Sequence, residues 1–187
     1  MTGERTALNF LGRLCGISTL TRDAVSLLEG THTKLLDTRK TTPGWRALEK
    51  YAVRTGGGYN HRFGLYDMFL IKDNHIALCD GIAKAINRAQ KLAGPSRKIE
   101  VEVETLDQLQ EAIAARADMI LLDNMDLATM RKAVTIVNGR IPLEASGNIT
   151  LEKLRAVAST GVDFISMGAL THSAINRDVG LDISFSH

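Results

Sequence analysis

The fold is decided by residues 34–75, which read KLLDTRKTTPGWRALEKYAVRTGGGYNHRFGLYDMFLIKDNH. Two short apolar runs in this stretch, at 34–36 and 68–71, are typical of strands, and charged side chains follow both runs. A segment with helical spacing and a glycine-rich turn lie between the runs. Because ligands of α/β folds bind outside the carboxyl ends of the strands, the cations in these positions predict a site for an anionic ligand.

The rest of the chain repeats this alternation of strand and helix. Six parallel strands joined by helices form either an open sheet or a barrel. Polar residues end nearly every predicted strand, and in a barrel those ends meet at one mouth. We therefore predict an α/β fold, an incomplete six-stranded parallel barrel. The further strands are expected at 99–103, 119–122, 141–145 and 164–167, and helices at 45–54, 81–92, 106–113, 127–137 and 151–159.

The N-terminal region is expected to be a helical lead-in over residues 1–30, followed by the barrel over residues 31–187. Two helices are predicted in the lead-in, at 4–14 and 21–28. Gly16 and Gly30 fit the position just past a helix end, where a left-handed backbone is easiest for glycine. Pro43 stands where the next helix could begin, because the missing N–H of proline costs nothing there.

Composition narrows the function classes. The chain has 187 residues and a formal net charge of +2, too small and too dispersed to indicate nucleic-acid binding. Its two cysteines form no disulfide framework or metal-ligand pattern, which indicates reduced thiols and a cytoplasmic location. No apolar run approaches the roughly 20 residues of a membrane helix, so no membrane partner is expected.

The predicted mouth has a cationic half and an acidic half. Several cations in one small pocket indicate a ligand with several negative charges, and arginine matches carboxylate or phosphate through two hydrogen bonds. The acidic half suits sugar hydroxyls, Mg²⁺ or a developing cation. The glycine-containing turns 146–148 and 167–169 expose backbone N–H groups suited to phosphate. The cationic half comprises Arg39, Lys40, His61, Arg62 and Lys72, and the acidic half Glu102 and Asp123.

Ordinary structural roles compete with these assignments. Glu102 belongs to an alternating run that also fits a strand with one solvent-facing side. Asp123 could instead cap the helix that follows it. Solvated surface positions are expected for Arg46, Lys50 and Arg54, and His32 and His172 are expected to be surface or hydrogen-bonded polar residues rather than catalysts.

Eight segments together form a more specific pattern. They are ERTALN (4–9), LLDTRKTTPGWR (35–46), GGGYNHR (56–62), LIKDNH (70–75), EVEVET (100–105), LLDN (121–124), EASGNIT (144–150) and DFISMGAL (163–170). In this order they resemble the quinolinate phosphoribosyltransferase family, also called nicotinate-nucleotide pyrophosphorylase (carboxylating). The combination of DTRKTTPG with GG-x-x-NHR is what makes the resemblance specific.

The resemblance implies an enzyme that transfers a phosphoribosyl group from PRPP to the ring nitrogen of quinolinate and then releases the 2-carboxylate as CO₂. The products would be nicotinate mononucleotide and pyrophosphate, a step in NAD biosynthesis. It also implies a type II phosphoribosyltransferase-like barrel and Mg²⁺ bound through the pyrophosphate of PRPP. The implied partners are the two substrates and further copies of the chain, as a homodimer or higher homo-oligomer.

Site residues follow from the resemblance position by position. Quinolinate carboxylates would be bound by Arg39, His61, Arg62 and Lys72, and Arg5 would reach the site of the neighbouring subunit. PRPP would contact Thr38, Lys40 and Lys72, its ribose would lie by Glu102 and Asp123, and its 5′-phosphate by Ser146, Gly147, Asn148, Gly168, Ala169 and Leu170. The catalytic residues would be Lys40, Lys72, Glu102 and Asp123.

Two alternatives stay open at this stage. Family members carry an additional N-terminal domain, whereas this sequence enters the barrel segments almost at once, so a fragment or a non-catalytic paralogue is one alternative. A sister family linked to molybdate transport shares the fold. The other alternative is a barrel lyase that uses Lys72 as a Schiff-base amine, which requires a lowered lysine pKa. Five cationic groups suit a polyanion better.

Overall fold

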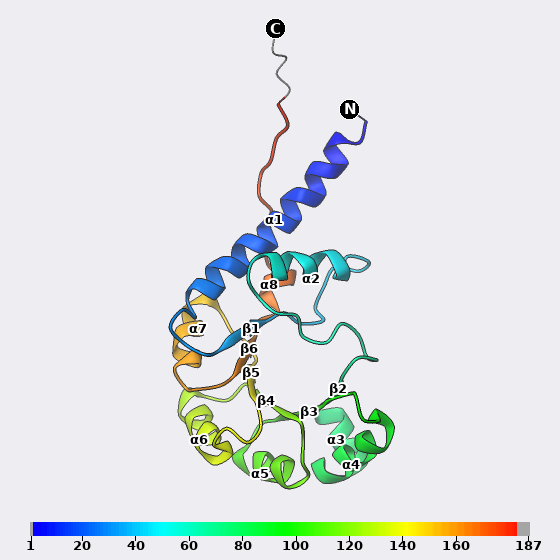
Figure 1. Ribbon diagram of the computed structural model, residues 1–187, viewed down its shortest axis with the longest axis vertical. Helices are drawn as coiled ribbons and strands as arrows, with labels where there is room; N and C mark the ends of the chain where they lie inside the picture. The colour runs from blue at the N-terminus through cyan, green and yellow to red at the C-terminus, as the bar shows by residue number, and fades with distance from the viewer. Residues whose placement is uncertain (1, 183–187) are drawn as a thin grey trace.

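A computed structural model of the chain describes residues 2–182 (Figure 1). Six parallel strands form one curved sheet in the order β1-β6-β5-β4-β3-β2. The strands are β1 (Lys34–Leu36), β2 (Phe69–Ile71), β3 (Ile99–Val103), β4 (Met119–Asp123), β5 (Leu143–Ser146) and β6 (Phe164–Ser166). The helices are α1 (Glu4–Ser26), α2 (Arg46–Thr55), α3 (Asp73–Cys79), α4 (Ile82–Ala93), α5 (Leu106–Ala114), α6 (Leu127–Val137), α7 (Leu151–Ala158) and α8 (Ala169–His172).

The predicted incomplete barrel is confirmed. The sheet curls inside a ring of helices that includes α4 to α7, and its two edges are β1 and β2 (Figure 1). Part of the gap between the edges is covered by the turn 56–62, which forms a single parallel bridge from Tyr59 to Leu36 of β1. The ring is therefore open at the place where the glycine-rich turn crosses it.

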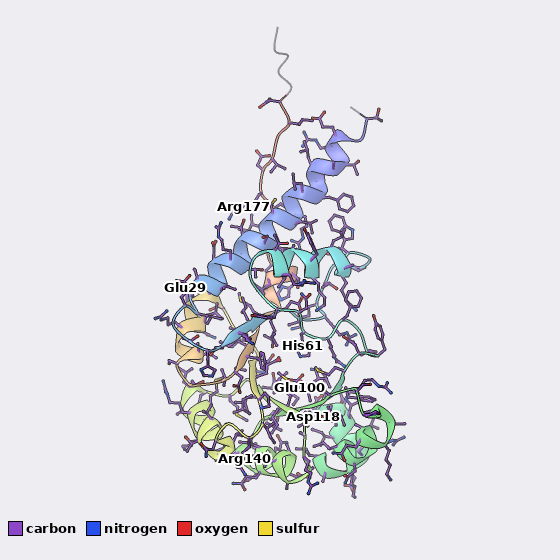
Figure 2. The ribbon with its side chains drawn as sticks, in the orientation of Figure 1. Glu29, His61, Glu100, Asp118, Arg140 and Arg177 are labelled. Carbon is purple, nitrogen blue, oxygen red and sulfur yellow. The ribbon has the colours of Figure 1, made fainter. Side chains whose placement is uncertain are left out.

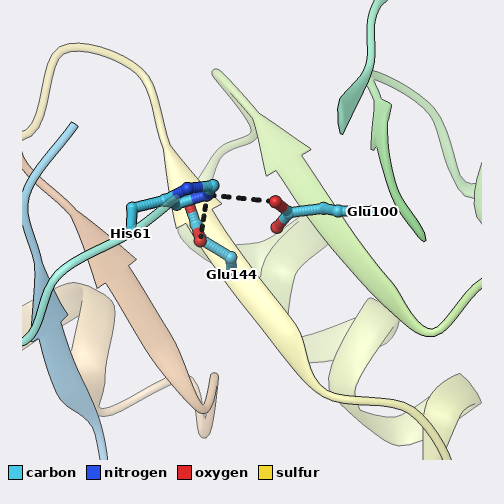
Figure 3. A group of neighbouring side chains, drawn as sticks. All are labelled: His61, Glu100 and Glu144. Carbon is cyan, nitrogen blue, oxygen red and sulfur yellow. Dashed lines mark hydrogen bonds and ion pairs between the residues drawn. The ribbon is translucent and has the colours of Figure 1, made fainter. Parts of the chain in front are cut away.

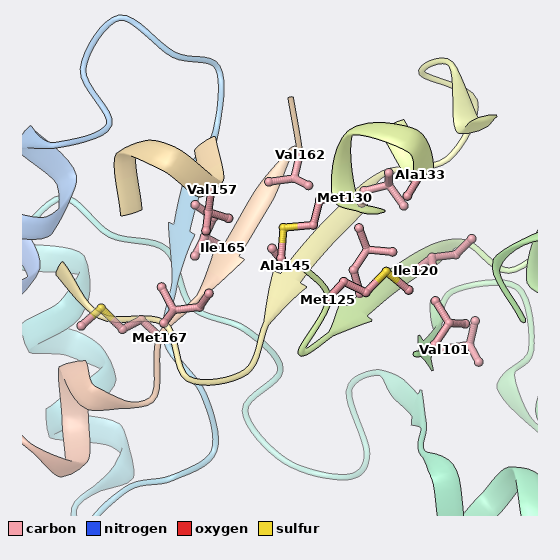
Figure 4. Packing of buried hydrophobic residues seen from close by; sticks show 14 of the residues in the cluster. Val101, Ile120, Met125, Met130, Ala133, Ala145, Val157, Val162, Ile165 and Met167 are labelled. Atoms are coloured by element: carbon pink, nitrogen blue, oxygen red, sulfur yellow. The ribbon is translucent and has the colours of Figure 1, made fainter. Parts of the chain in front are cut away.

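Strand periodicity separates the core from the barrel interior. Val101, Ala145 and Ile165 are fully buried on the side of the sheet that faces the helices, with Met130 and Val157 packed over them (Figure 4). Side chains of a strand alternate between its two faces, so the neighbouring residues point to the inside of the barrel. Several of those inward residues are ionisable, which makes the interior of this barrel polar near its mouth.

The N-terminal prediction of two helices is wrong. One continuous helix, α1, runs from Glu4 to Ser26, and Gly16 lies in its middle. A Cβ atom at Gly16 would lie 2.2 Å from the backbone oxygen of Ile175, and one at Gly12 would lie 2.6 Å from that of Arg177. Both glycines therefore let the C-terminal segment lie directly on α1, along which it runs in Figure 1. Gly30 does have the predicted left-handed backbone, with φ of 80°.

Other boundaries differ modestly from those predicted. The helix expected from Trp45 begins at Arg46, with Trp45 as its N-cap, so Pro43 lies ahead of it rather than at its start. The short helices α3 and α8 were not predicted. The division at residue 30 stays a prediction, and residues 1 and 183–187 of the two predicted regions lie outside the described residues. Within residues 2–182, no helix combines the length and apolarity that a membrane crossing requires.

Candidate active site

One cleft of about 930 Å³ opens at the carboxyl ends of the strands. It receives residues from the segments after β1 and β2, from the turn 56–62, and from the ends of β3 to β6. The predicted site residues that line it are Thr38, Arg39, Lys40, His61, Arg62, Lys72, Glu102, Asp123, Ser146, Gly147, Asn148, Gly168 and Ala169. Lining residues that were not predicted include Asn124, Glu144, Ile149, Thr150, Lys153, Ser166 and His172.

Two predicted site residues lie elsewhere in this chain. Leu170 is fully buried, so its side chain packs in the core and does not line the cleft. Arg5 is exposed on the first turns of α1 and lines a separate hollow of about 300 Å³ beside Asn176 and Arg177. Figure 1 shows this end of α1 extending away from the barrel. An Arg5 contact with the cleft of the same chain is therefore excluded by its position, and a contact with a second copy stays a prediction.

Arg39 and Arg62 lie close together in the cleft, which Lys72 also lines, although the three residues come from separate segments of the chain. Arg62 donates to the backbone oxygen of Met68 at 3.2 Å, which holds the guanidinium next to β2. Burial, followed by the charge of Arg39, lowers the pKa of Arg62. The two guanidinium groups thus repel each other, and an anion placed between them would relieve that repulsion.

Lys72 is already paired within the cleft. Its Nζ donates to Glu102 Oε2 at 2.7 Å, and the Lys72 side chain is half exposed whereas Glu102 is mostly buried. Glu102 therefore points into the barrel, and the solvent-facing alternative for it is wrong. Asp123 lines the cleft as well, while the helix after it is capped by Asp126, so the capping alternative for Asp123 is also wrong.

Asn124 connects the acidic side to the glycine turn. Its Nδ2 donates to Asp123 Oδ2 at 2.8 Å, and its Oδ1 accepts from Asn148 Nδ2 at 3.1 Å. Gly147 has φ of 96°, and a Cβ there would lie 2.2 Å from Asn124 Oδ1, so only glycine fits. From α7, Lys153 donates to the backbone oxygen of Asn148 at 3.2 Å and adds a cation to this end of the cleft.

Beneath the cationic side, a buried ion pair holds the turn 56–62 in place. Lys50 donates to Asp37 Oδ1 and, at 3.0 Å, to the backbone oxygen of His61. Asp37 also accepts from Asn60 Nδ2 at 2.7 Å and from the His61 amide at 2.8 Å. Lys50 is only 3% exposed, so the surface position expected for it is wrong. The ion pair therefore fixes the positions of Asn60 and His61 in the turn.

Arg46 also departs from the surface prediction, because it donates to Thr41 Oγ1, Phe63 O and Arg39 O. Arg54 and His32 are exposed as predicted. His172 is exposed too, but it lines the cleft beside Gly168. The backbone around the cleft is thus ordered by side chains on α2.

His61 and Glu100 lie inside the barrel (Figure 2), and the imidazole faces two fully buried glutamates, Glu100 and Glu144 (Figure 3). Its Nε2 is 3.0 Å from Glu100 Oε2 and 3.4 Å from Glu144 Oε2, and its Nδ1 accepts the Arg62 amide at 2.7 Å. Both ring nitrogens therefore have partners inside the protein, and neither is free for a ligand. The donor atoms of His61, Glu100 and Glu144 lie within 4.8 Å of one another, a spacing that is compatible with a metal ion. The 3.0 Å distance between His61 Nε2 and Glu100 Oε2, however, is that of a direct hydrogen bond.

Ionisation of this cluster is shifted toward the protonated forms. Burial, then the charge of Glu144, raises the pKa of Glu100. Burial alone would lower the pKa of His61, but the hydrogen bond to Glu100 and the close carboxylates of Glu100 and Glu144 outweigh it and raise that pKa to about 10. Both shifts have the same meaning, namely that the cluster keeps a proton to higher pH than separate groups would.

Comparison with known proteins places this geometry in a family. Residues 17–182 match the family described as "Quinolinate phosphoribosyl transferase, C-terminal domain". The chain belongs to this family. The match covers all six strands and the last ten of the 23 residues of α1, so the resemblance to this family is confirmed.

Individual members of the quinolinate phosphoribosyl transferase family are close in sequence. The chain is 54% identical over 187 residues to a protein of Bacillus subtilis named probable nicotinate-nucleotide pyrophosphorylase [carboxylating], and covers 65% of that protein. It is 47% identical over 186 residues to the nicotinate-nucleotide pyrophosphorylase [carboxylating] of Mycobacterium leprae, again covering 65%. The chain thus spans just under two thirds of the length of these relatives, with 100% and 98% of its own residues matched.

Solved structures of the family share the fold. A crystal structure of nicotinate-nucleotide pyrophosphorylase from Ehrlichia chaffeensis aligns with a TM-score of 0.93 at 47% identity, over 97% of this chain and 66% of that one. The Francisella tularensis structure of the same name gives 0.90 at 52% identity, over 94% and 63%. The barrel with its open edge and long N-terminal helix is therefore the family's fold.

Proposed function

We propose that this chain carries the catalytic barrel of a quinolinate phosphoribosyltransferase, which joins quinolinate to the ribose of PRPP and releases pyrophosphate and CO₂. One observation carries the proposal: cations from three separate segments and two carboxylates from neighbouring strands line one cleft of about 930 Å³. The names of the curated relatives support the substrate assignment. The role of each residue below is part of the proposal.

Quinolinate carries two carboxylates, and the cleft offers Arg39 and Arg62 to them. Each guanidinium presents a planar fork that matches a carboxylate. His61 contributes through its position under the ligand, because its two ring nitrogens already have protein partners. On ligand binding, Lys72 would leave its ion pair with Glu102 and bind the incoming anion. The Glu102 carboxylate would then be free to face the ribose. We expect the two arginines to dominate quinolinate affinity.

The sugar and phosphate would occupy the other side of the cleft. Departure of pyrophosphate leaves positive charge on the ribose, and the fixed carboxylates Glu102 and Asp123 stabilise it. Lys40 would stabilise the leaving group. The 5′-phosphate would lie against the backbone of turns 146–148 and 168–169, with Lys153 as an additional cation near the first turn. Leu170 takes part only by packing beneath the second turn.

Decarboxylation needs no protein nucleophile. Once the ring nitrogen carries the ribose it is positively charged. The electron pair from the breaking bond between the ring and the 2-carboxylate stays on the ring beside that charge. CO₂ leaves and a proton from the surroundings replaces it on the ring carbon. The protein binds and orients the intermediate during this step, which fits a cleft without a paired nucleophile and base.

Mg²⁺ would enter as part of the PRPP substrate. It would be bound through the pyrophosphate of PRPP, whose phosphate oxygens are the hard ligands that this ion prefers. A homo-oligomer in which Arg5 reaches the cleft of a second copy also stays part of the proposal. Its position on the outer end of α1 is compatible with that role.

The Schiff-base alternative is weakened by one contact. Lys72 Nζ lies 2.7 Å from Glu102 Oε2, and an ammonium held by a carboxylate is a poor nucleophile. The non-catalytic alternative keeps the same cleft but predicts no product. The two alternatives therefore differ from the proposal in what an assay would detect.

The test is an assay of the chain with quinolinate, PRPP and MgCl₂, in which pyrophosphate and nicotinate mononucleotide are measured together. We expect both products in equal amounts, and loss of turnover by roughly 10²-fold or more in Asp123→Asn. The matched control is Asp107→Asn in the exposed first turn of α5, which should keep full turnover. Binding of both substrates without product would favour the non-catalytic alternative, and a borohydride-trapped Lys72 adduct would favour the lyase.

A further inference from the structure

Glu100 and Glu144, the glutamates next to His61, have no role in the proposed chemistry, and their burial is electrostatically unfavourable. Glu100 of β3 and Glu144 of β5 are fully buried on the same face of the sheet, with β4 between their strands, and both carboxyl groups face the imidazole (Figure 3). Glu100 Oε1 and both oxygens of Glu144 have no hydrogen-bond donor in the described structure. Two ionised carboxylates with this few donors would be strongly destabilising in the interior.

The charged groups around Glu100 and Glu144 do not compensate two ionised carboxylates. The groups that face Glu100 are Glu144 from β5, and His61 and Arg62 from the turn 56–62. Arg62 is directed to the Met68 carbonyl rather than to either glutamate. His61 Nδ1 accepts the Arg62 amide, so the ring has one proton, on Nε2, to offer to two carboxylates.

A doubly charged pair would also oppose the ligand. Glu144 lines the floor of the cleft, next to the site proposed for a dianion. Two negative charges at that floor would repel the ligand's carboxylates and attract the arginines that should bind them. One proton on the pair removes half of that charge and supplies a donor for an oxygen that lacks one.

We infer that Glu100 and Glu144 share one proton in the folded chain, and that this makes them positioning residues for the His61–Arg62 turn. The proton keeps the imidazole between the two carboxyl groups and leaves the guanidinium of Arg62 available to an anion. A ligand that neutralises Arg62 strengthens the pair's hold on the proton, because a nearby cation favours the ionised carboxylate. This last consequence rests on the proposed function, whereas the shared proton does not.

The shared proton is testable in the free protein. Infrared spectra of the full chain at about pH 7 should contain the carbonyl-stretch band of a protonated carboxyl group, far above the ordinary titration range of glutamate. Glu100→Gln and Glu144→Gln should each remove the band. Glu104→Gln, at an exposed glutamate of the same alternating run, should leave it unchanged. Absence of the band in the unmodified chain would overturn the inference whatever the variants do.

The consequence for ligand binding is tested by calorimetry with quinolinate at about pH 8 in two buffers of different ionisation enthalpy. The unmodified chain should take up a fraction of a proton on binding, and Glu100→Gln should take up none while binding no more weakly. A loss of about tenfold or more in the affinity of folded Glu100→Gln would show that the ionised group is needed, and would overturn the positioning role. If no form binds quinolinate, the proposed function fails for this chain, and the infrared band still decides the shared proton.

Discussion

At the scale of single residues, Arg62 is the side chain on which ligand recognition should depend most. Its guanidinium lies beside that of Arg39, and its pKa is lowered by burial and by that neighbour. Arg62→Ala should weaken quinolinate binding by about 2–5 kcal/mol, since a buried carboxylate would lose its charged partner. PRPP binding should change much less. Titration calorimetry with each substrate separately measures both effects.

Arg54→Ala is the matched control for this measurement, because Arg54 is an exposed arginine of α2. It should leave both affinities unchanged. Equal losses of quinolinate and PRPP affinity in Arg62→Ala would contradict the assignment of Arg62 to the carboxylates.

Removal of Lys50 should cost substantial stability. Lys50 is the charged partner of the fully buried Asp37, and burial outweighs its effect so that the pKa of Asp37 is raised. Lys50→Met should lower the free energy of unfolding by about 3–5 kcal/mol, because it leaves a buried carboxylate unpaired. Urea denaturation measures the change. Arg54→Met on the same helix should stay within about 0.5 kcal/mol, and a similar cost for both variants would refute the pairing argument.

Individual site residues were predictable where they follow a strand directly. Arg39, Lys72 and Asp123 could be placed from their position at strand ends, and the cleft contains them. Glu100 and Glu144 were missed although strand alternation puts them on the same face as Glu102 and Ser146. Lys50 was missed because its partner Asp37 is distant in sequence, and a cation on an amphipathic helix looks solvated until that partner is known.

At the scale of elements, the contact of α1 with the C-terminal segment depends on two glycines. Gly16→Ala would raise helix propensity by about 1 kcal/mol, but its Cβ would lie 2.2 Å from the backbone oxygen of Ile175. The clash involves backbone, which cannot rotate away. We therefore expect a net loss of about 1–3 kcal/mol in the free energy of unfolding, measured by denaturation.

Gly180→Ala serves as the control for the helix variant, because nothing lies within 4 Å of a Cβ at that position. Its effect should stay within about 0.5 kcal/mol. A stabilised Gly16→Ala chain would mean that helix propensity outweighs the contact and that the C-terminal segment is held by other groups.

Among the elements, strand and helix type were predicted well in the second half of the chain, where apolar runs are bounded by clear breaks. The boundary at Gly16 failed for a physical reason. A glycine required by a backbone crossing looks the same in sequence as one that ends a helix, and only the packed partner distinguishes the two. The short α3 was missed because its seven residues span only about two turns, too few for a helical period to be recognised in the sequence.

At the scale of the whole molecule, stability should fall as the pH rises. Within the cluster of His61, Glu100 and Glu144 the pKa of His61 is raised from 6.5 to about 10, so the stability contributed by the proton that the cluster holds is complete below pH 6.5 and is lost as the pH rises through about 10. The raised pKa of Glu100 acts in the same direction at lower pH. The free energy of unfolding should decrease on the order of 2 kcal/mol between about pH 7 and pH 10.

Urea denaturation across this pH range measures the slope, and the variant isolates its source. His61→Gln should flatten the slope, while His32→Gln, at an exposed histidine, should leave it unchanged. An unaltered slope in His61→Gln would assign the pH dependence to other groups.

The order of the strands has a consequence for how the molecule is made. β1 pairs with β6, whose residues follow it about 130 positions later in the chain. During synthesis at roughly 5–20 residues per second, β1 therefore leaves the ribosome on the order of ten seconds before its neighbour exists. Throughout that interval its amide edge and the apolar side chains of Leu35 and Leu36 are exposed to solvent or to a chaperone. A nascent chain arrested before residue 164 cannot complete the sheet.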